Sequence, residues 1–309
     1  MLDKIIRFVS IKRSLIGASI LRVGFGIIIL YTYAINYSQR RFLWGPDGLT
    51  NTDYSQQTKP LTLYSFSNST MYFELIFHLG IVITMLFILG YMTRIMTILN
   101  YIFLYSIYHQ NGSILDGGYN LMLIISVYLI LVKSNEYLSI DKHLKKSKKD
   151  NIYINIIHNI GILSIIVQLC ILYLNSSLYK VMGEPWQNGT ALYYILQVKE
   201  FNLPWISNLI LSSDILIVFG TYFTVMLQVA FPFLLFNKIT KYIALLLIVP
   251  MHLGIAFVMG LISFSLTMVL IDTVLISDND YKKIYTFCKR KMLKFRKRNE
   301  VAEPIPKSM

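Results

Sequence analysis

Long apolar segments alternate with short polar ones along the whole chain. The apolar segments lie near residues 15–36, 71–90, 95–109, 118–132, 152–176, 212–236, 242–260 and 261–277. A helix of about 20 apolar residues crosses the roughly 30 Å hydrocarbon core of a bilayer, so this pattern predicts about eight transmembrane helices. The runs at 95–109 and 118–132, and the last two, are short. Their length favours tilted pairs or half-buried hairpins over full spans.

The runs are apolar throughout and do not alternate with polar residues, which indicates helices and argues against a β-barrel. We therefore expect an all-α, polytopic transmembrane helical bundle over residues 15–277. A cytoplasmic N-terminus at 1–14 and a basic cytoplasmic tail at 278–309 flank it. Because no small-residue cleavage site follows the first run, we interpret that run as a retained helix and not as a signal peptide.

Composition agrees with a membrane protein. Of the 309 residues, 55% are hydrophobic and 15% are charged, and the mean hydropathy is +0.55. The two cysteines are Cys170, in an apolar run, and Cys288, in the tail. They fall in different predicted compartments, which argues against a disulfide between them. No cluster of cysteine and histidine has the spacing of a metal site.

The basic residues are distributed unevenly over the predicted loops. With a cytoplasmic N-terminus, the inner segments hold 23 of the 29 Lys and Arg residues, and the outer segments hold five. This is the positive-inside pattern, so we expect a multi-pass protein of a bacterial cell membrane with both termini in the cytoplasm. The tail mixes aromatic residues with Lys and Arg, which is typical of a helix lying on anionic membrane lipid. Nucleic-acid binding is the weaker interpretation of this charge, since no binding motif accompanies it.

Ionisable residues at membrane depth are costly and mark candidate functional sites. Arg22 lies about seven residues from the inner end of the first predicted helix, and Asp272 about five residues from the inner end of the last, so each is about 10 Å deep. Their matched depth predicts a structural pair near the inner surface. The alternative is that Arg22 extends to that surface alone. His158 is a further ionisable residue within a predicted span.

Other candidates lie in the predicted outer half. Glu74 and His78 are four residues apart and share a helix face. His252 follows Pro250, whose kink favours a cavity beside the imidazole, although a packing histidine is an equally good interpretation. Asp116 precedes two glycines and a predicted helix that begins near Asn120. A turn followed by a helix cap explains that pattern without a catalytic role for Asp116.

The stretch "LYKVMGEPWQNGTAL" is the most elaborate of the predicted outer segments. It carries Lys180, Gly183, Trp186 and Gly189 directly after a long apolar run. Composition alone favours a structural loop in which the indole lies at the membrane interface. The catalytic interpretation is that a partly desolvated lysine acts as a base.

From these positions we predict that the Lys180 loop folds over an outward-facing cavity. Glu74, His78 and His252 would line that cavity, and a carboxylate, two imidazoles and an ammonium would form an acid–base set. The alternative is that the loop is a structural lid and takes no part in catalysis.

Several of these motifs together resemble the HTTM family, the horizontally transferred transmembrane domain, which includes the membrane domain of vitamin K-dependent gamma-carboxylase. "LYKVMGEPWQNGTAL" is similar to its Lys–Gly–Trp–Gly loop, "ILRVGFGIIIL" to its first helix, "LGYMTR" to the turn after its second helix, and "MHLGIAFVMGLISFSLTMVL" to its histidine-bearing helix. Within the family, "RRFLWGPDGL" and "ILDGGYNLML" resemble the sporulation-delaying protein B group.

The resemblance implies a role in the maturation or export of a small secreted antibacterial toxin peptide. Its implied partners are the toxin precursor peptide and a small soluble maturation protein, at the outer membrane face. Two alternatives stay open: a quinone- or lipid-dependent enzyme of carboxylase type, and a non-catalytic transporter or immunity-like protein. The family lysine that acts as base in the carboxylase branch corresponds to Lys180. Gln228 stands where many family members have glutamate, so the sequence assigns neither a reaction nor a cofactor.

Overall fold

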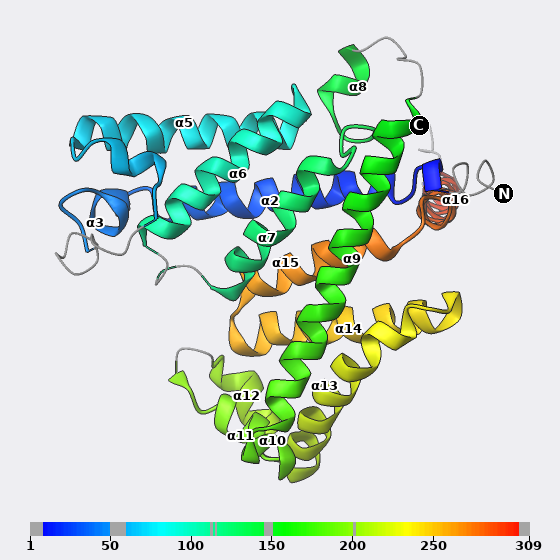
Figure 1. The fold of residues 1–309 in the computed structure, drawn as a ribbon. Helices are drawn as coiled ribbons and strands as arrows, with labels where there is room; N and C mark the ends of the chain where they lie inside the picture. The colour runs from blue at the N-terminus through cyan, green and yellow to red at the C-terminus, as the bar shows by residue number, and fades with distance from the viewer. Residues whose placement is uncertain are drawn as a thin grey trace, which may run out of the picture.

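The apolar runs fold into helices that pack into one bundle (Figure 1). The computed structural model describes residues 9–49, 60–111, 114, 116–144, 151–199 and 202–302, without the side chains of 294–302. The elements are α2 (Leu15–Ile35), α3 (Arg40–Trp44), η1 (Leu63–Phe66), α5 (Thr70–Leu89), α6 (Thr93–Gln110), α7 (Gly117–Leu131), α8 (Ile140–Leu144), α9 (Ile152–Val181), α10 (Glu184–Gln187), α11 (Ala191–Ile195), α12 (Pro204–Leu211), α13 (Asp214–Leu234), α14 (Lys238–Met259), α15 (Ile262–Asp272), η3 (Thr273–Leu275) and α16 (Asp278–Ala302).

The expected all-α, polytopic bundle is confirmed, and within the described residues five helices are long and apolar enough to cross a membrane: α2, α5, α9, α13 and α14. A sixth span results if the α15–α16 pair, bent by 106°, is counted as one. The expected helices at 95–109 and 118–132 form as α6 and α7. With 15 residues α7 is about 22 Å long, too short for a full span. α6 carries Arg94, Asn100 and His109, which lower its apolarity.

The core lies where α2 packs against α5 and α15, and where α9 packs against α7 and α13. Small residues allow the close approaches. A Cβ at Gly118 would lie 2.8 Å from the Phe264 Cα, and a Cβ at Gly17 would lie 2.5 Å from the Thr273 carbonyl oxygen. Side chains larger than hydrogen at these two positions would push α15 and η3 away from their neighbours.

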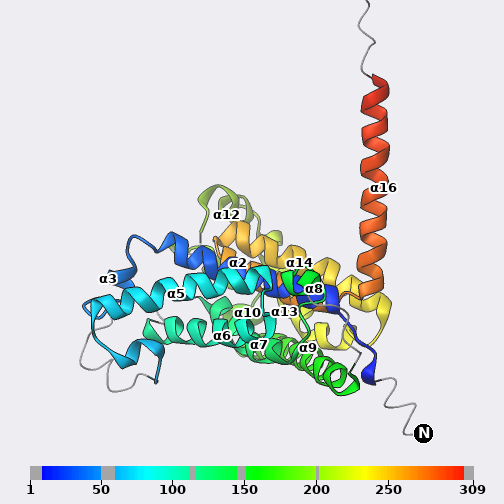
Figure 2. The same ribbon diagram turned by 90° about the horizontal axis from the view of Figure 1, so that it is seen from above.

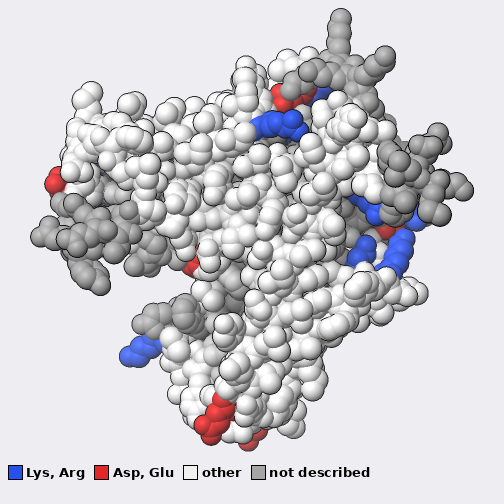
Figure 3. All heavy atoms as spheres, viewed as in Figure 1, with Lys and Arg blue, Asp and Glu red and all other residues white. Residues whose placement is uncertain are grey.

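Residues 9–14, α8, the turn between α13 and α14, and α16 all lie toward one end of the bundle (Figures 1 and 2). α16 runs across the direction of α2 and α5 in both views. On the face that Figure 3 shows, most of the visible Lys and Arg side chains lie toward this end, near α8 and near the turn between α13 and α14. The segments predicted to be cytoplasmic therefore meet at one end, while the side of the membrane they face stays a prediction.

The longest helix, α9, crosses the bundle diagonally (Figure 1). Its 30 residues measure about 45 Å, more than the roughly 30 Å of hydrocarbon, so the helix is tilted or extends beyond the bilayer. His158, near its beginning, is buried and donates from Nε2 to the Arg13 carbonyl at 2.8 Å while Nδ1 accepts from the Lys133 amide at 3.0 Å. Both imidazole nitrogens are satisfied, so His158 fixes the start of α9. Lys180 lies at its other end.

Candidate functional site

Lys180 is held at the end of α9 by neutral groups. Its ammonium donates to the Ser176 hydroxyl and to the Gln228 side-chain oxygen, each at 2.7 Å. It also lies 5.3 Å from the centre of the Trp186 ring, within the range of a cation–π contact. In the described part of the chain no carboxylate pairs with this ammonium.

The segment after Lys180 turns back so that Trp186 comes to cover the lysine. Gly183 caps the short helix α10, its amide bonding the Lys180 carbonyl at 2.9 Å. Gly189 has φ of +73°, a left-handed conformation that side chains other than hydrogen adopt only with strain. The Tyr222 ring packs on Gly189, and the Tyr222 hydroxyl donates to the Gln187 carbonyl at 2.7 Å. Gly189 thus permits the turn after α10, and Tyr222 of α13 holds the loop in place.

His252 lies on α14 and is fully buried beside α9. Its Nε2 is 2.9 Å from the Tyr173 hydroxyl, and Phe231 and Phe264 pack around this pair. No described residue bonds its Nδ1. Tyr173 is seven residues before Lys180 on the same face of α9. The Tyr173–His252 pair therefore lies one to two helical turns deeper in the bundle than the ammonium.

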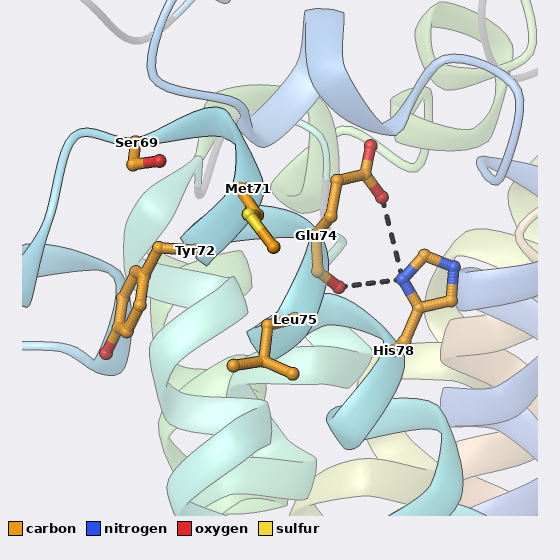
Figure 4. A pocket seen from close by; sticks show the side chains of 6 residues that line it. All are labelled: Ser69, Met71, Tyr72, Glu74, Leu75 and His78. Carbon is orange, nitrogen blue, oxygen red and sulfur yellow. Dashed lines mark hydrogen bonds and ion pairs between the residues drawn. The ribbon is translucent and has the colours of Figure 1, made fainter.

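Glu74 and His78 form a second, separate group near α3. The Glu74 carboxylate accepts from Arg40 Nε at 2.9 Å and from Arg41 Nε at 2.5 Å, and the hydrogen bond that Arg40 donates to Glu74 raises the pKa of Arg40. His78 Nδ1 lies 2.7 Å from the Glu74 carbonyl, and its Nε2 lies 2.9 Å from the Tyr37 hydroxyl. Figure 4 shows the imidazole turned back toward Glu74. The two residues line a shallow, mostly apolar depression with a volume of about 620 Å³.

The structure does not bring the four predicted catalytic residues into one cavity. Lys180 and His252 lie on α9 and α14, which the Tyr173–His252 hydrogen bond links, whereas Glu74 and His78 lie at the beginning of α5, away from α10 in both ribbon views (Figures 1 and 2). Glu74 is neutralised by two arginines, which the sequence places in the same outer segment. Of the predicted acid–base set, Lys180 and His252 are linked through Tyr173 of α9, and their catalytic role stays a prediction.

Arg22 and Asp272 do not meet either. Arg22 is fully buried, and its guanidinium donates to backbone carbonyls: Ser134 at 3.1 Å, Ile88 at 2.7 Å, Leu138 at 2.5 Å, and Phe87. Those carbonyls belong to the end of α5 and to the segment before α8. Arg22 therefore links α2 to the end of α5 and to the segment before α8.

Asp272 is 1% exposed at the end of α15, and neither of its carboxyl oxygens has a hydrogen-bond partner among the described residues. The buried Ser265 and Thr267 hydroxyls on the same helix likewise lack partners there. Buried polar groups of this kind are ordinarily bonded to protein or to internal water. Asp272 thus belongs to a polar part of the core near α15.

Asp116 has the capping role that its sequence context allows. Its Oδ1 accepts from the Gly118 amide at 2.9 Å, and its Oδ2 accepts from the Ser263 hydroxyl, which ties α7 to the start of α15. Asn120 is exposed on the first turn of α7. Neither residue reaches the Lys180 group. Within the described ranges, no group of three or more His, Cys, Asp or Glu side chains is arranged to hold a metal ion.

Sequence reasoning missed two partners of the site, Tyr173 and Ser176. Both precede Lys180 at helical spacing, by seven and four residues, so the pattern of one α9 face held the signal. Gln228, which stands where many family members have glutamate, accepts a hydrogen bond directly from the lysine. The site can therefore bind and orient a polar group at the membrane boundary, with a Tyr–His pair beneath it.

Comparison with known proteins places these features in context. The sequence matches the HTTM domain over residues 15–280. It is 26% identical over 201 residues to the sporulation-delaying protein SdpB of Bacillus subtilis (strain 168), a match that covers 64% of this chain and 62% of that protein. It is also 26% identical over 229 residues to YitO of the same strain, an uncharacterized protein, covering 72% of this chain and 73% of YitO. The match to SdpB spans less than two thirds of that protein's length. No solved structure matches the chain.

Proposed function

Because the chain belongs to the HTTM domain family, we propose that this multi-pass membrane protein acts in the maturation or export of a small secreted antibacterial toxin peptide. The similarity to the sporulation-delaying protein SdpB carries the proposal. The toxin precursor is the substrate, a small soluble protein is the partner, and the work is done at the outer face of the cell membrane.

The Lys180 group supports a direct role toward the peptide. It lies in the segment predicted to be outside, on the loop that resembles the Lys–Gly–Trp–Gly loop of the family and falls within the matched residues 15–280. The ammonium lies 2.7 Å from the Gln228 side-chain oxygen and 5.3 Å from the centre of the Trp186 ring, so the group offers a positive charge, a hydrogen-bonding amide and an aromatic face. These are groups that bind a peptide carboxylate or a backbone carbonyl.

Deletion of the gene in its own host, followed by mass spectrometry of the secreted peptides, tests the proposal. The mature toxin should disappear and return with the wild-type gene. Complementation with Lys180→Met should fail at normal protein abundance, while Lys199→Met, a change at an exposed lysine on the same predicted side, should succeed. Unchanged toxin in the deletion strain would contradict the proposal. Mature toxin retained inside the cells would instead indicate the transporter alternative.

A lipid- or quinone-dependent enzyme of carboxylase type is the second candidate. The observation favouring it is the lysine without a carboxylate partner in the described residues, above the buried Tyr173–His252 pair. The same spectra distinguish it: a carboxylase would increase the mass of the peptide by one carbon dioxide, and this increase would be lost in Lys180→Met. An unmodified mature peptide would exclude carboxylation of the toxin.

A further inference from the structure

The helix α16 leaves the bundle at a sharp angle. The axis turns by 106° between the α15–η3 segment and α16, with a break of two residues between them. In Figure 2 the helix extends sideways from the end of the bundle, across the direction of α2 and α5. A helix at about a right angle to spanning helices, starting where they end, lies along the membrane surface and does not cross it.

The first turn of α16 is fastened to the bundle by several contacts. Asp278 accepts from the amides of Leu15 and Ile16 at 3.0 and 2.7 Å, which also caps the beginning of α2. Asp280 accepts from the Tyr242 hydroxyl at 2.6 Å, and the Tyr281 hydroxyl donates to the Thr273 carbonyl at 2.8 Å. The direction of the helix is therefore set by hydrogen bonds to α2, α14 and η3.

Beyond this turn, every described side chain from Lys282 to Leu293 is exposed. At about 100° per residue, Tyr281, Tyr285, Cys288 and Met292 fall within an arc of about 60° on one face of the helix. The Tyr281 hydroxyl turns that face toward the bundle, and therefore toward the bilayer that surrounds the bundle. Exposed apolar and aromatic side chains on this face lack any covering in the described structure.

Most charged side chains lie on the rest of the circumference. The described basic residues there are Lys282, Lys283, Lys289, Arg290 and Lys291, interspersed with Ile284, Thr286, Phe287 and Leu293. The only acids of the helix before residue 299 are the two that bond the bundle in its first turn. An apolar stripe beside a dense positive charge is the pattern of helices that insert shallowly among anionic headgroups.

We propose that α16 is an in-plane lipid-binding helix, which lays the face of Tyr281, Tyr285 and Met292 into the inner leaflet and pairs its lysines with anionic phospholipid headgroups. The bend and the first-turn hydrogen bonds hold it at the correct height before lipid binds. The charge then selects a leaflet rich in acidic lipid over a neutral one. This inference does not depend on the toxin pathway.

A fluorescent label on Cys288 tests the proposal in the full-length chain. Cys170 is replaced by Ser, the label is polarity-sensitive, and the protein is placed in lipid nanodiscs of either pure phosphatidylcholine or phosphatidylcholine with phosphatidylglycerol. Quenching by acrylamide in the buffer reports how far the apolar face is buried. The variant Lys282→Gln/Lys283→Gln/Lys289→Gln removes charge, and Lys199→Gln is the control for charge loss elsewhere.

We expect quenching to be at least about twofold weaker in discs with acidic lipid, and this protection to be lost in the triple variant or in 1 M salt but kept in Lys199→Gln. Equal quenching in the two kinds of disc would overturn the proposal. Protection that appears in neutral discs only when RNA is added, or only at high protein density, would overturn it in favour of nucleic acid or a second copy of the chain.

Discussion

The hydroxyl of Tyr173 lies 2.9 Å from Nε2 of His252, deep between α9 and α14 and beneath Lys180. Replacement of Tyr173 by Phe keeps the ring packing on Phe231 and leaves the imidazole without this partner. We expect a loss of about 1–3 kcal/mol in the free energy of unfolding, measured by thermal or denaturant unfolding in detergent. Adding His252→Phe should cost less than the sum of the single changes, and additive losses would show that the two groups do not interact.

Gln228 positions Lys180 through its amide oxygen. Gln228→Glu keeps an acceptor at the same place, so the secreted peptide should still be made. Gln228→Leu removes the acceptor, and we expect the yield of mature peptide to fall about tenfold or more at normal protein abundance, as displacement of a positioned group commonly does. Quantitative mass spectrometry of the medium, normalised to an immunoblot, measures both. Equal yields from the two variants would argue that the lysine needs no positioning.

Gly189 sustains the loop that covers Lys180. Gly189→Ala forces a methyl group into a left-handed conformation and to 3.1 Å from the Tyr222 ring, so a loss of about 1–3 kcal/mol in stability is expected. Gly254 is the matched control, because it lies inside α14 and a methyl group added there would meet no atom within 4 Å. Gly254→Ala should be neutral or stabilising by up to about 1 kcal/mol. A Gly189→Ala protein with wild-type melting would contradict the strained turn.

Arg22 and Asp272 should behave as independent residues. Arg22→Gln leaves buried carbonyls without a donor, and we expect a loss of about 3 kcal/mol or more, whereas Asp272→Asn should change stability little because the carboxyl bonds no described residue. The double variant should equal the sum of the two within about 0.5 kcal/mol. Recovery of stability in the double variant would restore the ion pair that the sequence predicts.

The orientation in the membrane is open to a direct test. A membrane-impermeant maleimide added to intact cells should label Thr50→Cys and not Ser308→Cys, two positions outside the described residues, in a background with Cys170 and Cys288 replaced. The expectation rests on the distribution of 23 basic residues in the inner segments and five in the outer ones. Labelling of Ser308→Cys in intact cells, with lysed cells as the positive control, would reverse the topology.

The helices were predictable from sequence because hydrocarbon demands continuous apolar runs, and their boundaries follow the runs closely. The shortness of the apolar runs at 95–109 and 118–132 was visible too, although the depth of α6 and α7 in the bilayer was not. The family likeness identified the Lys180 loop and is confirmed by the match to the HTTM domain and to SdpB. In all these cases the signal is local, within one helix or one loop.

The partners of the ionisable residues were not predictable in the same way. Depth along separate helices suggested that Arg22 meets Asp272, yet backbone carbonyls satisfy the guanidinium, and no side-chain pattern identifies a carbonyl. The predicted cavity failed to assemble because the tilt of α9 carries Lys180 away from α5, and tilt follows from packing. The ion pairs of Glu74 with Arg40 and Arg41 do have a signal in the sequence, because the two arginines lie in the outer segment that leads into the helix carrying Glu74.

The hydrogen bonds from Arg22 to later segments of the chain have a consequence for how the protein is inserted into the membrane. The first helix emerges from the ribosome with a guanidinium in its middle, and one of the carbonyls that bonds it belongs to Leu138, 116 residues later. At about 5–20 residues per second, that carbonyl is synthesised on the order of ten seconds afterwards. Until then, burying the unpaired guanidinium of the first helix in lipid is energetically unfavourable. We therefore expect the insertion machinery to retain the first segment until the later ones have been made, so that the two enter the bilayer together.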